Sequence, residues 1–144
     1  MRKVSHLICN KGNTVYTIQG SLSVYDALEF MVSKNIGALV VYNENEFVGI
    51  MTERDYARKV ILRGKSSDKT AVAEIMDTYP ATVTFDDTIE RCMEIMSDKH
   101  IRYLPVVADR HVVGLVSMGD VVRFIMEDQK STIEHLQNFI TGAV

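Results

Sequence analysis

The sequence contains no tryptophan, two prolines and two cysteines in 144 residues. Cys9 and Cys92 lie far apart without a CxxC pair, and the four histidines show no metal-ligand spacing, which argues against a disulfide framework or a structural zinc site. The longest apolar stretches, such as residues 38–42, are far too short to span a bilayer. No long apolar region follows the charged start, as a secretory signal would require. We therefore expect a cytoplasmic protein with free thiols and no membrane association.

The sequence also has no large excess of charge of either sign. Sixteen basic and nineteen acidic residues give a formal net charge of -3, which offers no general attraction to nucleic acid or to anionic membranes. Apolar residues make up 47% of the chain and charged residues 24%, enough to bury a core and remain soluble. The length suits one ordinary domain or two very small ones.

Motifs of nucleotide-processing enzymes are missing. The sequence has no GxG, which removes the Rossmann fingerprint, and no HExxH. Residues 64–66 (GKS) match the end of a P-loop, but the earlier glycine of that motif would fall at Lys59. We expect a protein that is not an enzyme and has no catalytic cofactor or metal. Weak nucleotide processing stays as an alternative, because an aspartate beside a hydroxyl could in principle hydrolyse a nucleotide.

The sequence does contain an internal repeat. A shift of 65 positions aligns Thr17–Arg58 with Thr82–Arg123 without a gap and gives eleven identities, including a glycine and an aspartate near the end of each copy. The lead-in recurs as well, since VSHLI at Val4 corresponds to VAEIM at Val72 after three extra residues in the first copy. We predict two repeats, 4–62 and 72–128, joined by the polar linker 63–71, and a C-terminal helix over 131–141.

Each repeat has the pattern strand–helix–strand–strand–helix. Extended segments are expected at 15–18 and 81–83, and hairpins at 38–42 with 47–51 and at 103–107 with 112–116. The inward stripes of the first helices are predicted to be Val24, Ala27, Leu28, Met31 and Val32, and Ile89, Cys92, Met93 and Met96. Those of the second helices are Tyr56, Ala57, Val60 and Ile61, and Val121, Val122, Ile125 and Met126. The C-terminal helix is expected to begin with a capping box at Ser131 and Glu134.

One such repeat would bury little surface and leave open sheet edges. Two repeats packed sheet to sheet with pseudo-two-fold symmetry would correct both defects. We therefore predict an α+β, sandwich-like fold of two β-α-β-β-α units. That symmetry creates two equivalent clefts between the repeats, where a small molecule is commonly bound.

Two tetrapeptides, TERD at Thr52–Asp55 and SMGD at Ser117–Asp120, each precede an apolar helix. In one interpretation each is a capping box that satisfies free N–H groups at a helix start. In the other, the helix start attracts phosphate and the aspartate accepts hydrogen bonds from both hydroxyls of a ribose. The residues alone leave both interpretations open.

The segments GALVVYNENEFVGIMTERDYARKV and IRYLPVVADRHVVGLVSMGDVVRFI resemble the cores of two cystathionine-β-synthase (CBS) domains. From about Val4 to Met126 the chain resembles a tandem CBS pair, or Bateman module. The resemblance implies sensing of an adenosine ligand such as AMP, ADP, ATP, NAD or S-adenosylmethionine, a separate effector protein, and a homodimer. The C-terminal helix would either join that dimer or fold back on its own chain. A nucleotide-independent interaction module remains an alternative, whereas the acidic balance argues against a nucleic-acid partner.

The resemblance also implies site residues. Asp55 and Asp120 would hold ribose hydroxyls, with Thr52 and Ser117 beside them. In that family a pocket usually combines the Ser/Thr-x-x-Asp of one repeat with adenine-lining positions of the other repeat. The adenine would contact Tyr16, Ile36, Gly37 and Ala38 in one cleft, and Ala81, Ile101, Arg102 and Tyr103 in the other. Arg102 is expected to reach phosphate from the Asp120 side, and Arg54 and Lys59 to serve phosphate on the Asp55 side. Because Gly119 stands where the first copy has Arg54, the two clefts are expected to differ in charge.

Overall fold

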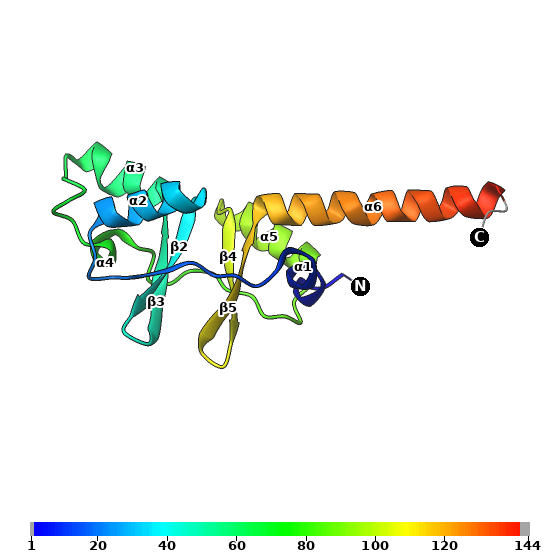
Figure 1. Cartoon of the computed structure of the whole chain (residues 1–144), viewed down its shortest axis with the longest axis horizontal. Helices are drawn as coiled ribbons and strands as arrows, with labels where there is room; N and C mark the ends of the chain where they lie inside the picture. The colour runs from blue at the N-terminus through cyan, green and yellow to red at the C-terminus, as the bar shows by residue number, and fades with distance from the viewer. Residues whose placement is uncertain (1, 142–144) are drawn as a thin grey trace.

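The computed structural model describes residues 2–141 and has the predicted order of elements in the first repeat, and in the second from its first helix onward (Figure 1). The first repeat contains β1 (Thr17–Gln19), α2 (Val24–Lys34), β2 (Ala38–Asn43), β3 (Glu46–Thr52) and α3 (Glu53–Lys59), followed by a 3-10 turn, η1 (Ile61–Arg63). The second contains α5 (Ile89–Lys99), β4 (Tyr103–Ala108), β5 (His111–Ser117) and α6 (Met118–Thr141). The two lead-in segments form α1 (Val4–Lys11) and α4 (Val72–Ile75). The fold is α+β, as predicted.

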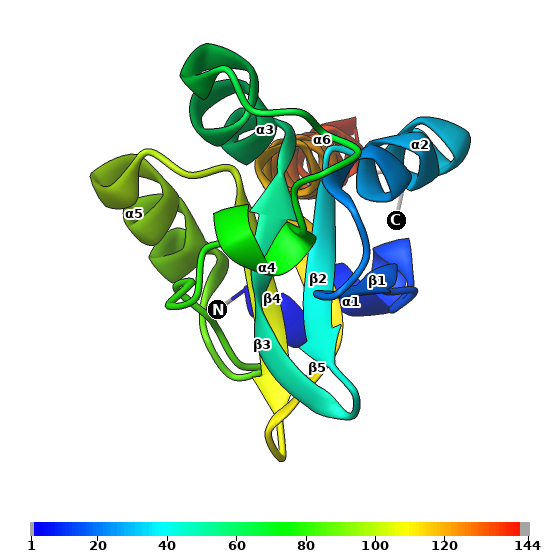
Figure 2. The same ribbon diagram turned by 90° about the vertical axis from the view of Figure 1, so that its left-hand side faces the viewer.

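Both hairpins form at the expected positions. In the first sheet β1 pairs parallel with β2, and β2 pairs antiparallel with β3; in the second sheet β4 pairs antiparallel with β5. The segment expected to be extended before α5 forms a single parallel bridge, Val83 to Val106, instead of a strand. Figure 2 looks along the long axis, with α3 and α5 on one side of the hairpins and α1 and α2 on the other.

The lead-in helices are exchanged between the repeats. Val4, Leu7 and Ile8 of α1 are buried in the core of the second repeat, whereas Val72 and Ile75 of α4 are buried in the core of the first. The same backbone contact holds each of them, an antiparallel bridge from Lys3 to Thr88 on one side and from Ala71 to Ser23 on the other. Figure 1 accordingly shows α1 beside α5 and α4 beside α2 and α3. Each packed unit therefore contains the lead-in helix that belongs to the other repeat of the sequence.

The helices α2 and α5 begin and end in the same way. The Ser23 hydroxyl accepts a hydrogen bond from the Asp26 N–H, and the Thr88 hydroxyl accepts one from the Arg91 N–H. Both helices end at a residue in the left-handed conformation, Asn35 and His100. Most of the predicted inward stripes are buried or partly buried. The exceptions are exposed and show that those predictions were wrong: Val32, Ile61, Met93, Val122 and Met126.

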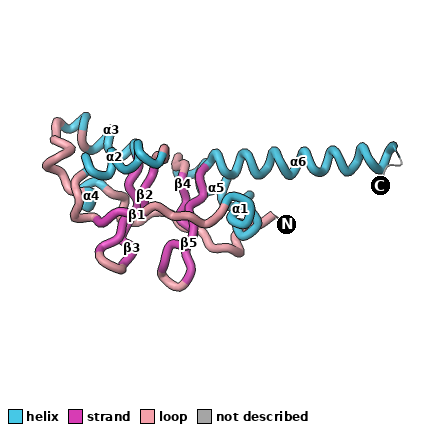
Figure 3. The backbone as a smooth tube through the Cα atoms, viewed as in Figure 1, coloured by secondary structure: helices cyan, strands magenta, loops and turns pink. Residues whose placement is uncertain are grey.

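The predicted C-terminal helix over 131–141 is not a separate element. It is the final part of α6, which runs without interruption from Met118 to Thr141, so Ser131 and Glu134 form no helix start. Residues 129–141 are all exposed, and α6 projects beyond the body of the molecule (Figure 3). The prediction failed because the chain contains no helix-breaking glycine or proline between residues 120 and 141.

Candidate functional site: two clefts between the repeats

Both tetrapeptides form the capping boxes that one interpretation predicted. The Thr52 N–H donates to Asp55 Oδ2 at 2.9 Å and the Asp55 N–H donates to Thr52 Oγ1 at 3.3 Å. The second pair repeats the geometry, with the Ser117 N–H to Asp120 Oδ2 distance at 2.9 Å and the Asp120 N–H to Ser117 Oγ distance at 3.1 Å. Capping therefore fixes the orientation of both carboxylates, and it uses only part of their acceptor capacity, since a carboxylate offers about four lone-pair sites.

The first cleft, which we call the Asp55 cleft, has a volume of about 370 Å³. It lies between the two repeats. The start of α3 from the first repeat faces two segments of the second, the one that precedes α5 and the one that leads into β4. The lining includes every residue expected opposite Asp55: Ala81, Ile101, Arg102 and Tyr103. Arg54 also lines it and crosses to the other repeat, where its guanidinium donates to the His100 carbonyl oxygen.

The second cleft, which we call the Asp120 cleft, has a volume of about 400 Å³. It combines the start of α6 with residues of the first repeat. The lining includes Ser117 and Asp120 together with the four residues expected opposite them: Tyr16, Ile36, Gly37 and Ala38. Both volumes fall in the lower part of the range of about 300–1,000 Å³ that is typical of small-molecule sites.

Tyr103 lies between the two clefts and lines both. A Cβ atom at Gly37 would stand 2.4 Å from the Tyr103 hydroxyl oxygen, so the absence of a side chain at Gly37 allows this close approach. A tyrosine hydroxyl therefore occupies the space beside Gly37. Burial, together with the nearby Glu53 carboxylate, raises the pKa of Tyr103 above its ordinary value.

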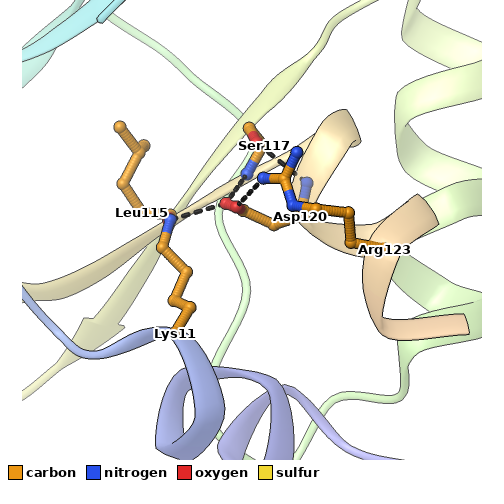
Figure 4. A network of polar contacts seen from close by, with 5 residues as sticks. All are labelled: Lys11, Leu115, Ser117, Asp120 and Arg123. Carbon is orange, nitrogen blue, oxygen red and sulfur yellow. Dashed lines mark hydrogen bonds and ion pairs between the residues drawn. The ribbon is translucent and has the colours of Figure 1, made fainter. Parts of the chain in front are cut away.

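The two carboxylates have different cationic neighbours. Lys11 donates to Asp120 Oδ2 at 2.5 Å and Arg123 donates to Asp120 Oδ1 at 2.8 Å, as Figure 4 shows. Burial opposes ionisation of Asp120, but the Lys11 ammonium and the Ser117 N–H outweigh it, so the pKa of Asp120 lies below its ordinary value. Asp55 instead has Lys59 of its own helix, at 3.3 Å from Oδ1. The charged residues that line the clefts therefore differ: Glu53, Arg54, Asp77 and Arg102 accompany Asp55, whereas Lys11 and Arg123 accompany Asp120.

Two residues that were predicted to contact phosphate, Arg102 and Lys59, lie elsewhere than expected. Arg102 lines the Asp55 cleft together with Glu53 and Arg54 at the start of α3, and it does not line the Asp120 cleft. Lys59 does not line the Asp55 cleft, since its ammonium donates to the Ile75 carbonyl oxygen of α4 at 2.9 Å.

Sequence reasoning also missed several lining residues. Lys11 and Arg123 line the Asp120 cleft, and Glu53 and Asp77 line the Asp55 cleft. The match of Arg58 with Arg123 in the repeat could have indicated Arg123. Lys11 carried no such signal, because it belongs to the lead-in helix, whose exchange between repeats is a tertiary feature.

Two features are absent from residues 2–141. This part of the chain brings together no group of three or more His, Cys, Asp or Glu side chains that could hold a metal ion. Nor does it contain a helix that is both long and apolar enough to cross a membrane.

Known proteins share this sequence and fold. The family model described as "CBS domain" matches residues 1–62 and 72–127. The mitochondrial CBS domain-containing protein CBSX3 of Arabidopsis thaliana is 42% identical over 125 residues, covering 83% of this chain and 61% of the relative's length. The chain therefore spans less than two thirds of that curated relative.

Two solved structures are similar over nearly their whole length. The CBS-domain protein NE2398 is 42% identical with a TM-score of 0.83, covering 87% of this chain and 98% of that one. A CBS-domain protein of Burkholderia ambifaria MC40-6, named as a candidate signal-transduction protein, is 40% identical with a TM-score of 0.85, covering 88% and 96%. With two matched copies over most of its length, this chain belongs to the CBS domain family.

Proposed function

We propose that this CBS pair is a sensor module that binds adenosine-containing ligands, such as AMP, ADP, ATP or NAD, in the clefts between its repeats and signals to a separate protein. The observation that supports the proposal is that both repeats contribute residues to each cleft. Each cleft places a capped aspartate from one repeat opposite apolar and aromatic residues from the other. An apolar wall suits a flat base, and the carboxylate suits the two hydroxyls of a ribose.

A ligand in such a cleft could act as a signal because it contacts both repeats. Binding shifts the relative position of the repeats only if the ligand binds one position more tightly than another. The Asp55 cleft supplies Arg54 and Arg102 for a phosphate, and the Asp120 cleft supplies Lys11 and Arg123. Guanidinium groups are well matched to phosphate oxygens.

The proposal is tested by measuring the affinity of the full chain for AMP, ATP and NAD by calorimetry, for the wild type and for Asp55→Asn and Asp120→Asn. Asparagine keeps an oxygen that can accept the capping N–H, so the helix start is preserved while the charge is lost. A hydrogen bond to a charged group contributes about 1.5–3 kcal/mol, so each variant should lose about ten-fold or more in affinity at its cleft.

Asp86→Asn is the matched control, because the Asp86 side chain is 93% exposed and lies outside both clefts. It should bind as the wild type does. If the two cleft variants are folded by circular dichroism and also bind as the wild type does, the aspartates only cap their helices and the proposal is refuted. Conversion of ATP or NAD to products during prolonged incubation would instead favour the enzymatic alternative.

We also propose that the protein is a homodimer in which α6 contributes to the contact. The projecting part of this helix exposes Ile133, Leu136 and Ile140 at spacings of three and four residues. Together with the exposed Met126 they form one apolar stripe along the helix. A stripe of this kind on a soluble protein usually marks a contact with another chain, and a second copy presents an identical one.

Light scattering on the full chain tests the dimer. The double variant Ile133→Lys, Leu136→Lys should shift the protein toward the monomer, because it places two charges in the contact. Ser131→Lys, Asn138→Lys adds the same charge at exposed positions on the opposite face of the helix and should leave the assembly unchanged. A wild-type protein that is monomeric at micromolar concentration would refute the dimer.

A further inference from the structure

The Asp120 cleft contains a cation with no equivalent in the Asp55 cleft. Lys11 is the last residue of α1, which continues for one turn beyond Leu7, the residue that corresponds to Ile75 at the end of α4. Because α1 packs on the second repeat, this extra turn brings Lys11 to the start of α6. Its ammonium donates to Asp120 Oδ2 at 2.5 Å and to the Leu115 carbonyl oxygen at 2.7 Å (Figure 4).

In the structure Lys11 forms an ion pair with the Asp120 carboxylate, the group that would accept the hydrogen bonds of a ribose. Asp120 Oδ2 accepts from Lys11 and from the Ser117 N–H, and Oδ1 accepts from Arg123. Since a carboxylate has about four acceptor sites, a sugar diol that donates two hydrogen bonds must displace a charged donor. The Asp120 side chain is only 10% exposed and that of Lys11 is 33% exposed, so water screens this ion pair only in part.

The Asp55 carboxylate differs in this respect. Both of its recorded hydrogen bonds come from Thr52 and fall on Oδ2. Its Oδ1 lies 3.3 Å from the Lys59 ammonium, which has its own partner at 2.9 Å in the Ile75 carbonyl oxygen. A diol can therefore approach Oδ1 of Asp55 without first breaking a short ion pair.

We propose that Lys11 is a specificity-determining residue, which makes the Asp120 cleft select ligands that carry phosphate next to a sugar diol. A phosphate gives the Lys11 ammonium a new anionic partner when the diol takes Asp120, and the flexible lysine stem can follow it. A nucleoside offers the ammonium no such anionic partner. This inference rests on the proposed nucleotide binding and adds that the two clefts differ in their preference for nucleotides over nucleosides.

The test measures AMP and adenosine affinities by calorimetry in an Asp55→Asn background, where the Asp120 cleft dominates binding. AMP should bind much more tightly than adenosine. Adding Lys11→Met should weaken AMP binding and leave adenosine binding unchanged or tighter, so the ratio of the two affinities should fall about ten-fold or more. Lys130→Met, which removes an exposed lysine of α6, is the control and should not change the ratio.

The outcomes separate the two proposals. If AMP binds and the ratio is the same with and without Lys11, the role of Lys11 is refuted while nucleotide binding stands. If Lys11→Met weakens AMP and adenosine equally, Lys11 only supports the cleft, and the proposed selectivity is again refuted. If neither ligand binds in either the wild type or the Asp55→Asn background, the proposed function itself fails and this inference fails with it.

Discussion

The exchange of lead-in segments predicts that two equivalent glycines respond differently to the same substitution. Gly49 on β3 and Gly114 on β5 occupy the same position of the repeat. A Cβ atom at Gly49 would lie 2.4 Å from the carbonyl oxygen of Asp77, the residue just after α4 and its C-cap. A Cβ atom at Gly114 would lie 3.0 Å from the terminal methyl group of Ile8 on α1. A backbone oxygen cannot move aside as easily as the end of a flexible side chain.

The magnitude for Gly49→Ala follows from the contacts that must shift. Two backbone hydrogen bonds join Ile50 and Asp77, at 3.1 and 2.8 Å. Losing both costs about 1–3 kcal/mol, and crowding in a packed region adds about 1–3 kcal/mol. Replacing a strand glycine by alanine returns about 0.5–1 kcal/mol. We therefore expect Gly49→Ala to lower the free energy of unfolding by about 3 kcal/mol, which corresponds to about 10 °C in melting temperature for a chain of this size.

Gly114→Ala is the matched control. Rotation of the Ile8 side chain relieves its contact, and the gain from removing a strand glycine offsets most of the remaining cost, so we expect a change within about 1 kcal/mol. Chemical denaturation and calorimetry measure both variants. Equal effects at the two glycines would show that Asp77 does not pack on β3 as described, and would refute the exchanged arrangement of α4.

Three further predictions concern single groups. Because the folded pKa of Asp120 lies below its ordinary 3.8, the Lys11 pair stabilises the protein above the unfolded pKa and loses this effect as the pH falls through the folded pKa. The difference in urea-unfolding free energy between wild type and Lys11→Met should therefore be largest near neutral pH and shrink below about pH 4; a pH-independent difference would contradict the pair. Burial raises the pKa of the Cys92 thiol to about 11. At pH 8 only the exposed Cys9 should therefore react quickly with a disulfide reagent. Two fast thiols would mean that the core of the second repeat, which contains Cys92, opens readily. Ser23→Ala removes the N-cap of α2 and should cost about 1 kcal/mol, whereas an unchanged melting temperature would show that the cap contributes nothing.

Much of the fold could be predicted from the repeat because local patterns decide it. Alternation and turn residues locate the hairpins, and helical periodicity locates α2 and α5. The predictions failed where burial depends on what lies next to a helix. Val32 and Met126 have the right spacing for an inward face, yet both are exposed, since periodicity shows that a face is apolar without showing what covers it.

The candidate site divides in the same way. The sequence pointed to the two aspartates, their hydroxyl partners and the residues opposite them, and the structure brings these groups together in two clefts. The sequence alone could not show that Arg102 lines the Asp55 cleft, or that Lys11 contacts Asp120, which is 109 positions away. Which cleft a long cationic side chain enters depends on the packing of the element that carries it.

The sequence by itself determined the duplication, the order of helices and strands in each copy, and the two capped aspartates, because each depends on residues within a few positions of one another. Only the tertiary structure decided that α1 and α4 pack on opposite copies, which makes two similar sequences into two unequal clefts. The physical reason is that such packing is set by the fit of distant surfaces: the apolar face of α1 is buried among α5, β4 and β5, and that contact, rather than any local pattern, holds the Lys11 ammonium against Asp120.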